Sequence, residues 1–166
     1  EMQEQIPLLK KENLNYEIYA KKAFQELFKK ELVDKAAMKL YNYTSSIIAW
    51  GKGNGQFEMQ LLPKEVQFSS VNTSCVMDVN KDGILDIILG GNQYEFKPQF
   101  GRLDSNHGSV LLGNKKGNFS WLPYANSGFF LTGEVQKIKT IKNKNNTTAI
   151  LAVLNNNTPK LYTSNE

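Results

Sequence analysis

The chain of 166 residues contains one cysteine, one histidine and one arginine, and it has no run of eighteen apolar residues. The single cysteine, Cys75, excludes an intrachain disulfide, and its position in an apolar stretch favours a buried thiol. No set of cysteines and histidines has the spacing of a zinc site. Because no apolar segment is long enough, the sequence predicts no membrane-spanning helix.

The scarcity of arginine also bears on partners. The formal net charge of +4 comes from nineteen scattered lysines and Arg102 against sixteen acidic residues. Nucleic-acid surfaces draw heavily on arginine and interleaved aromatics, so no nucleic-acid partner is expected. Catalysis is not expected either, since no nucleophile elbow is present. Asp104, Ser105 and His107 are neighbours in sequence, but a catalytic triad is defined by its geometry and not by adjacency.

The chain does have an acidic loop of nine residues, Asp78–Asp86. Oxygen-bearing side chains stand at its first, third, fifth and ninth positions, and Gly83 at the sixth permits a sharp turn. Ca²⁺ prefers six to eight oxygen ligands, and a tight loop supplies several when alternate side chains point inward. The alternative is a solvated turn between strands. We predict one calcium site, held by the side chains of Asp78, Asn80, Asp82 and Asp86 and by the backbone carbonyl of Ile84.

The loop is not an EF-hand. An EF-hand loop ends in a bidentate Glu at its twelfth position, where this chain has Leu89. The flanking segments, Val71–Met77 and Ile84–Leu89, are β-like and not amphipathic helices. The sequence therefore predicts a strand–loop–strand calcium site.

Two stretches of the chain, Ser46–Asn92 and Ser109–Asn156, follow the same plan. Each begins with an apolar run, turns at a Gly-x-Phe, continues through Leu-Pro and an aromatic residue, and ends with a strand, a polar loop and another strand. Each stretch accommodates four short strands, as in one propeller blade. Alignment places the following residues of the second copy opposite the four ligand side chains: Lys142, Lys144, Asn146 and Ile150. Because an ammonium group cannot be a ligand, the second loop, 143–146, is predicted to be a plain polar turn.

The calcium loop, followed by Ile87-Ile-Leu-Gly-Gly91, resembles the FG-GAP or VCBS repeat, the blade unit of integrin-α-type β-propellers. The surrounding phrases are most similar to repeats of large bacterial cell-envelope proteins, over roughly residues 46–155. The resemblance implies a calcium ion within a blade and an extracellular or envelope location (periplasm or outer-membrane surface). The phrases that carry it outside the loop are Gly55-Gln-Phe57, Leu62-Pro63, Gln67-Phe68-Ser69, Gly101-Arg-Leu-Asp104 and Ser127-Gly-Phe-Phe130.

The N-terminal part has a different pattern. Apolar and aromatic side chains recur at helical spacing, with a phase break near Lys30 and lysines on the other face. This pattern predicts one long broken helix, or two shorter helices, over residues 13–42. Packing against the flank of a blade is preferred over a membrane-surface position, because glutamates interrupt a modest apolar face.

A long segment without strand character, Asn92–His107, contains the only arginine and the only histidine. Long loops in compact domains are often functional. One interpretation is a ligand-facing loop with aromatic residues for stacking and a guanidinium for a carboxylate. The other is that Arg102 pairs with a local carboxylate and holds the loop in place. The candidate ligand residues are Tyr94, Phe96, Arg102, Asp104 and His107.

The sequence thus predicts a mainly β fold with an N-terminal helical segment, in which two propeller-blade-like repeats of about four antiparallel strands each belong to a larger propeller. The predicted parts are residues 1–45 (helical), 46–107 (calcium loop and long loop) and 108–166 (degenerate repeat). Since two blades do not close a ring, further blades of a longer parent chain or a second copy are expected to cover the open edges.

The predicted function is a non-enzymatic, calcium-stabilised repeat segment for adhesion or display of a protein or glycan ligand. The alternatives are a carbohydrate-binding module, using Tyr94, Phe96, Trp50 or Trp121, or an accessory domain of a larger envelope enzyme.

Overall fold

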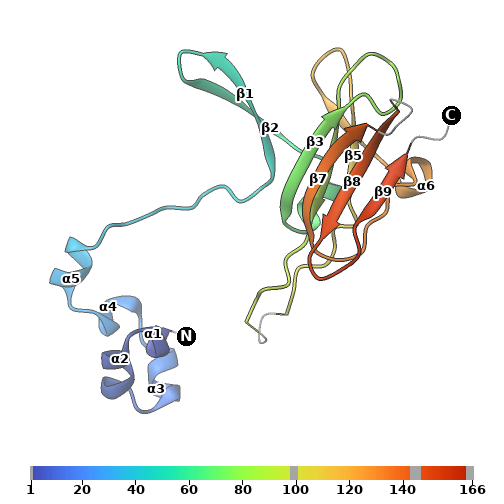
Figure 1. The fold of residues 1–166 in the computed structure, drawn as a ribbon. Helices are drawn as coiled ribbons and strands as arrows, with labels where there is room; N and C mark the ends of the chain where they lie inside the picture. The colour runs from blue at the N-terminus through green and yellow to red at the C-terminus, as the bar shows by residue number, and fades with distance from the viewer. Residues whose placement is uncertain (1, 98–100, 143–146, 164–166) are drawn as a thin grey trace. The chain divides into compact units, whose positions relative to one another are not determined.

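The computed structural model describes residues 2–97, 101–142 and 147–163. The chain divides into two compact units, residues 1–43 and residues 44–166, which are described separately. Figure 1 shows short helices in the first unit and β-strands in the second.

Residues 2–43 of the first unit form five short helices, and the longest have six residues. The prediction of one long helix or two shorter ones over residues 13–42 is therefore wrong in length, although the helical type is right. Helices end early because the backbones of Lys22, Phe28 and Ala36 are extended. Asn15 starts one of them by accepting hydrogen bonds from the amides of Glu17 and Ile18. The helices are α1 (Met2–Gln5), α2 (Pro7–Glu12), α3 (Tyr16–Lys21), α4 (Phe24–Leu27) and α5 (Lys30–Lys35).

No helix in the described part of the chain is long and apolar enough to cross a membrane.

The second unit is mainly β, and its described residues form three antiparallel sheets. The N-terminal hairpin is β1 (Ile47–Gly53) with β2 (Gln56–Leu61). The central sheet has the order β3 (Val71–Met77), β4 (Asp86–Gly91), β5 (Ser109–Gly113) and β6 (Phe119–Leu122). The C-terminal sheet is β7 (Val135–Lys142), β8 (Thr148–Leu154) and β9 (Lys160–Thr163). Two short helices, η1 (Lys64–Phe68) and α6 (Tyr124–Ser127), follow β2 and β6.

The grouping of strands differs from the predicted one. We expected each of the stretches 46–107 and 108–166 to form its own four-stranded sheet. Instead, the central sheet takes two strands from each stretch and crosses the boundary at residues 107 and 108. The pairing of Ile87 with Leu111 and of Ile88 with Val110 joins the two halves. The sequence pattern of a hairpin does not show which other hairpin it will pair with in a sheet, because that depends on long-range strand pairing.

The central sheet is covered on both faces. Ile88 and Leu89 are neighbours on β4, so their side chains point to opposite faces, yet both are buried. Ile88 packs in a cluster with Ile138 of the C-terminal sheet. Leu89 packs in a second cluster with Leu62 and Val66, which follow the N-terminal hairpin. The amide of Ile138 also donates to Thr73 Oγ1 at 3.1 Å, which ties β7 to β3.

A buried asparagine fixes the end of β4. The Asn92 side chain donates to the carbonyls of Asn106 (2.7 Å) and Gly133 (3.0 Å) and accepts from the Asn106 amide (2.8 Å). Its backbone has φ 74°, which asparagine tolerates better than most residues. The preceding Gly91 approaches Ser70 so closely that a Cβ would lie 1.7 Å from the Ser70 carbonyl oxygen. These contacts hold both ends of the long loop that begins at residue 93.

Candidate metal centre

The acidic loop connects β3 to β4 and carries its polar side chains on a tight backbone. Asp78 accepts hydrogen bonds from the amides of Asp82 (Oδ1, 3.1 Å) and Gly83 (Oδ2, 2.8 Å). Asn80 accepts from the Asp82 amide at 3.2 Å and donates to Asp82 Oδ2 at 2.9 Å. Lys81 and Gly83 adopt positive φ angles of 61° and 83°. The turn therefore brings Asp78, Asn80 and Asp82 together, as the spacing predicts for side chains that share one loop.

Asp86 has a different position from the other three. It begins β4 and is fully buried. Its Oδ2 accepts from the Val79 amide and its Oδ1 from the Gly113 amide, both at 2.8 Å. A carboxylate that accepts backbone N–H groups in a buried position makes charge-assisted hydrogen bonds, which are among the stronger kinds. Asp86 thus links the start of the acidic loop to β5.

The residues fit calcium in the chemistry of their donors. All five predicted ligands offer oxygen atoms, and an oxygen that already accepts one hydrogen bond retains a second lone pair. Within residues 2–97, 101–142 and 147–163, however, no three acidic, histidine or cysteine side chains lie close enough together to hold a metal ion as they stand. Asp78, Asn80 and Asp82, with the Ile84 carbonyl, are the residues on the loop itself that would hold the ion, and Asp86 lies at its base.

In the second repeat, the residues equivalent to the acidic loop lie between β7 and β8, and none of them is a carboxylate. Counting from the register shift near Val71 in β3 and near Val135 in β7, the strand pairs place Ala149 at the position of Asp86. This is one residue before Ile150, which the sequence alignment had placed there, and both residues are apolar. The predicted polar turn at 143–146 lies outside the described residues.

The long loop brings three of its five candidate residues together. Arg102 forms an ion pair with Asp104 (Nη2 to Oδ2, 3.0 Å), and the Tyr94 hydroxyl donates to Asp104 Oδ1 at 2.5 Å. The Arg102 guanidinium lies over the Tyr94 ring, 4.6 Å from its centroid. Burial raises the pKa of the Tyr94 phenol, and the hydrogen bond to Asp104 raises it further. One face of this ring is therefore occupied by Arg102, which favours a role in holding the loop.

The other two candidates lie apart from this group. The His107 ring stacks on Phe130 (4.6 Å between centroids) and meets Tyr124 edge-on at 6.2 Å. Its Nδ1 lies 3.2 Å from the Leu131 carbonyl oxygen. Asp104 and His107 therefore have different partners, although they are close in sequence. Phe96 is exposed.

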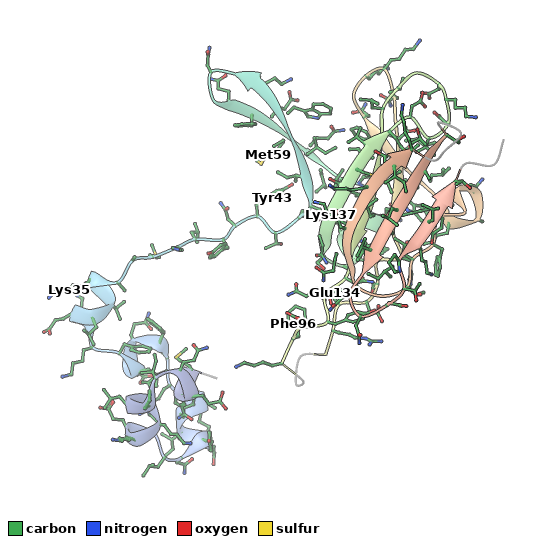
Figure 2. The ribbon with its side chains drawn as sticks, viewed as in Figure 1. Lys35, Tyr43, Met59, Phe96, Glu134 and Lys137 are labelled. Carbon is green, nitrogen blue, oxygen red and sulfur yellow. The ribbon has the colours of Figure 1, made fainter. Side chains whose placement is uncertain are left out.

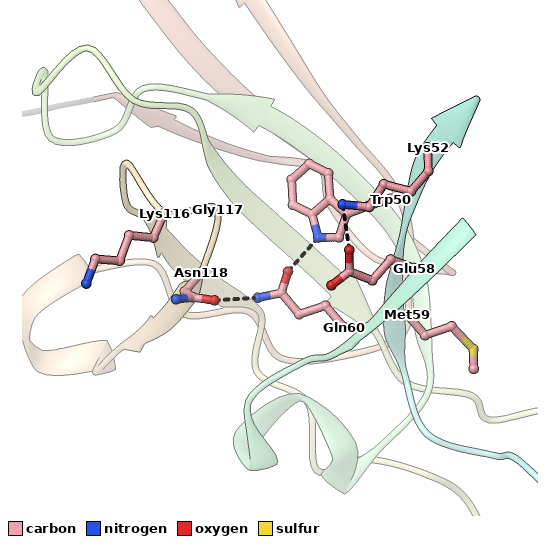
Figure 3. A pocket seen from close by; sticks show the side chains of 8 residues that line it. All are labelled: Trp50, Lys52, Glu58, Met59, Gln60, Lys116, Gly117 and Asn118. Carbon is pink, nitrogen blue, oxygen red and sulfur yellow. Dashed lines mark hydrogen bonds and ion pairs between the residues drawn. The ribbon is translucent and has the colours of Figure 1, made fainter. Parts of the chain in front are cut away.

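A cavity of about 380 Å³ lies beside Trp50, where the N-terminal hairpin meets the β5–β6 turn (Figure 3). The Trp50 indole N–H donates to Gln60 Oε1 at 2.6 Å, and Gln60 Nε2 donates to Asn118 Oδ1 at 3.3 Å. Trp50 also stacks on Phe119 with their ring centroids 6.3 Å apart. Trp50 is therefore a contact residue between hairpins as well as a wall of this cavity.

Sequence reasoning missed two residues that hold Asp86 at the base of the acidic loop. Gly113 donates to Asp86, and a Cβ on it would lie 2.4 Å from the Leu85 carbonyl oxygen, so only glycine fits without movement. Val79 supplies the other donor to Asp86 through its backbone. A glycine at the end of an apolar run was the only signal for the first, and a backbone donor leaves no signal in the side-chain pattern.

Comparison of the chain with protein-family models, with curated proteins and with solved structures found no match.

Proposed function

We propose that residues 44–166 are a non-enzymatic, calcium-stabilised β-repeat module of the FG-GAP or VCBS type, which serves as a rigid scaffold for display of a protein or glycan ligand. In this proposal the calcium ion is structural. It is held by Asp78, Asn80, Asp82, the Ile84 carbonyl and Asp86, and it acts on the loop between β3 and β4.

The observation that carries the proposal is the convergence of Asp78, Asn80 and Asp82 on one tight turn whose base is the buried carboxylate of Asp86. The negative charges of Asp78 and Asp82 on one turn repel each other, and a divalent cation held by that turn would offset this repulsion. The positive φ angle of Lys81 costs free energy because this residue has a Cβ, whereas Gly83 adopts its positive φ without that cost. A bound ion would stabilise this turn against other conformations of the loop.

The order of elements supports the repeat part of the proposal. The N-terminal hairpin is followed by Leu62-Pro63, the short helix η1 and the hairpin β3–β4. The hairpin β5–β6 is followed by Leu122-Pro123, the short helix α6 and the hairpin β7–β8. In both β3–β4 and β7–β8 the register shifts near the first residue of the first strand. Layers stacked face to face in chain order are the arrangement expected of neighbouring propeller blades.

An extracellular or cell-envelope location follows from the proposed family type. Extracellular calcium modules have dissociation constants of roughly 10⁻⁴–10⁻³ M, which suit the millimolar calcium outside cells. Display of a ligand would then fall to exposed loops supported by the sheets.

Replacement of Asp82 by alanine tests the metal. At a calcium concentration about tenfold above the dissociation constant, binding adds roughly 1.4 kcal/mol to the free energy of unfolding. We expect Asp82→Ala to lose most of this in calcium, a fall of roughly 5 °C in Tm, and little in chelator, because the side chain is exposed. Thermal melting of both proteins in calcium and in EGTA measures the difference.

Asn114→Ala is the matched control. Asn114 is exposed in the β5–β6 turn and accepts from the amides of Lys116 and Asn118 at 2.9 and 3.1 Å, as Asp82 accepts from a loop amide, but it has no acidic neighbours in that turn. Its loss should be the same in calcium and in EGTA. An Asp82→Ala loss that is equally independent of calcium would reject the metal.

A further inference from the structure

The last strand, β9, lies against β8 in the same position as β5 lies against β4. Relative to the register shift that β3 and β7 share, Ile87 of β4 and Ile150 of β8 are equivalent residues. Ile87 pairs with Leu111 of β5, and Ile150 pairs with Tyr162 of β9. Tyr162 therefore occupies the position of Leu111, and β9 lies against β8 as β5 lies against β4.

β5 and β9 differ at the strand edge that faces away from β4 and β8, respectively. β5 pairs there with β6, in which Leu111 is opposite Trp121. Among the described residues, β9 has no strand on that edge. A recess of about 570 Å³ lies beside it, with walls from both sheets and from the segment after β6. Its apolar walls include Leu122, Phe129, Ile150, Leu161 and Tyr162.

The N-terminal hairpin carries an exposed apolar face that could fill this recess. Phe57, Met59 and Leu61 lie on one face of β2, and their exposed fractions are 67%, 64% and 58%. In chain order β2 corresponds to β6, because both strands lead directly into Leu-Pro. Leu61 then corresponds to Trp121, which is packed into an apolar cluster. Within the described residues, β2 pairs only with β1 and has a free edge.

The β2 strand of the same chain is held elsewhere. Gln60 bonds to Asn118, and Trp50 stacks on Phe119, which belongs to the cluster on the opposite face of the central sheet from the recess. Met59 points to the other side of the hairpin from Trp50 and Gln60 (Figure 3), and Figure 2 also shows it at the hairpin. The recess is therefore not filled by β2 of the same chain, whereas β2 of a second copy offers the apolar face and the free strand edge that would fill it.

We infer that this protein self-associates head to tail, with β2 of one copy pairing antiparallel to β9 of the next and Leu61 opposite Tyr162. Phe57, Met59 and Leu61 of the first copy then enter the recess of the second. An exposed strand edge beside an exposed apolar face is a template for such pairing. Because the two surfaces are different, a pair of copies keeps one β2 and one recess free, and association continues into an open array or a closed ring.

Light scattering on the full chain over a range of concentrations tests this inference. The wild type should form dimers and larger species as its concentration rises, and Met59→Glu should remain monomeric, because a charge would be buried in the recess. Val76→Glu is the control: it makes the same kind of change at an exposed residue of β3 and should associate like the wild type. A wild type that is monomeric at all concentrations, or association that Met59→Glu leaves unchanged, overturns the inference.

The register is tested by cross-linking between two different variants. The pair Leu112 with Ser120 in the β5–β6 hairpin predicts that Thr163 lies opposite Gln60 of the neighbour. A mixture of Thr163→Cys and Gln60→Cys chains should form a disulfide-linked pair on mild oxidation. Thr163→Cys with Glu58→Cys, two residues away on the same face, should form much less. Equal yields from the two mixtures would overturn the register. Both experiments are run in EGTA as well, so that a failure of association is distinguished from a failure of calcium binding.

Discussion

At the scale of single residues, Asp86 differs most from what its place in the sequence indicates. Its spacing from Asp78 and Asp82 predicts that Asp86 is a fourth ligand side chain of the same loop. In the fold it is fully buried, and its two oxygens hold the amides of Val79 and Gly113. It therefore contributes to the contact between β4 and β5 independently of the proposed calcium ion.

Asp86→Asn separates these two roles. The amide keeps the shape of the side chain but replaces one acceptor oxygen with an NH2 donor, so one of the two backbone N–H groups loses its acceptor, which costs about 1–3 kcal/mol in a buried site. We expect this loss in urea unfolding both in calcium and in EGTA. The exposed Asp82→Ala, by contrast, should be nearly silent in EGTA. If Asp86→Asn were also silent in EGTA, the structural role of this carboxylate would be disproved.

At the scale of elements, the end of β4 determines how the long loop begins. Asn92 joins this strand end to residues 106 and 133, which lie far apart in the sequence. Gly91 permits the approach, since its Cα lies against the Ser70 carbonyl. The ion pair of Arg102 with Asp104 then holds the interior of the loop near Tyr94. Of the two interpretations of Arg102, the contacts agree with the one in which it holds the loop.

Gly91→Ala should destabilise the second unit by more than about 2 kcal/mol, because the new Cβ would overlap a backbone oxygen that cannot move independently. Gly51→Ala in β1 is the control. A Cβ there meets only Phe57 Cε1 at 4.0 Å, so its effect on the free energy of unfolding should be near zero. Chemical denaturation measures both changes. Equal stability of the two variants would show that the strand end relaxes more easily than its geometry indicates.

At the scale of the whole molecule, the chain consists of two units that differ in how much they bury. In the first unit only Gln3, Leu9 and Asn13 are buried among the described residues, whereas the second has two apolar clusters. Short helices with little burial are marginally stable. The segment 36–43 between α5 and β1 has neither helix nor strand, and Met38 and Tyr41 in it are 91% and 81% exposed.

Limited chymotrypsin digestion should therefore cut first within residues 1–43, with early cleavage near Met38 and Tyr41, because exposed irregular backbone is the preferred substrate of proteases. A fragment that begins near residue 44 should persist, and mass spectrometry of the time course identifies it. Trypsin is the control for enzyme specificity, since Lys39 lies in the same segment. A first cut inside the central sheet would contradict the division of the chain.

The sequence by itself determined what depends on short-range chemistry. Val71–Met77 forms a strand with the predicted bounds, and the acidic turn follows it. In the described part of the long segment after residue 92, the pairing that the structure shows is an isolated bridge between Gln93 and Leu103. A run such as Ile87-Ile-Leu predicts burial on both faces, and Ile88 and Leu89 are buried there. These features follow from residue type, spacing and turn chemistry, which act over a few neighbours.

Tertiary structure decided the features that depend on distant partners. The joining of two hairpins across residues 107 and 108, the position of Asp86 against Gly113, and the place of β9 beside β8 all depend on strand pairs between separated segments. The helical pattern of residues 13–42 was also broken into pieces, because a pattern shows which face is apolar but not where the backbone leaves the helix. Local periodicity is compatible with several pairings, and only the burial of complementary faces selects one of them.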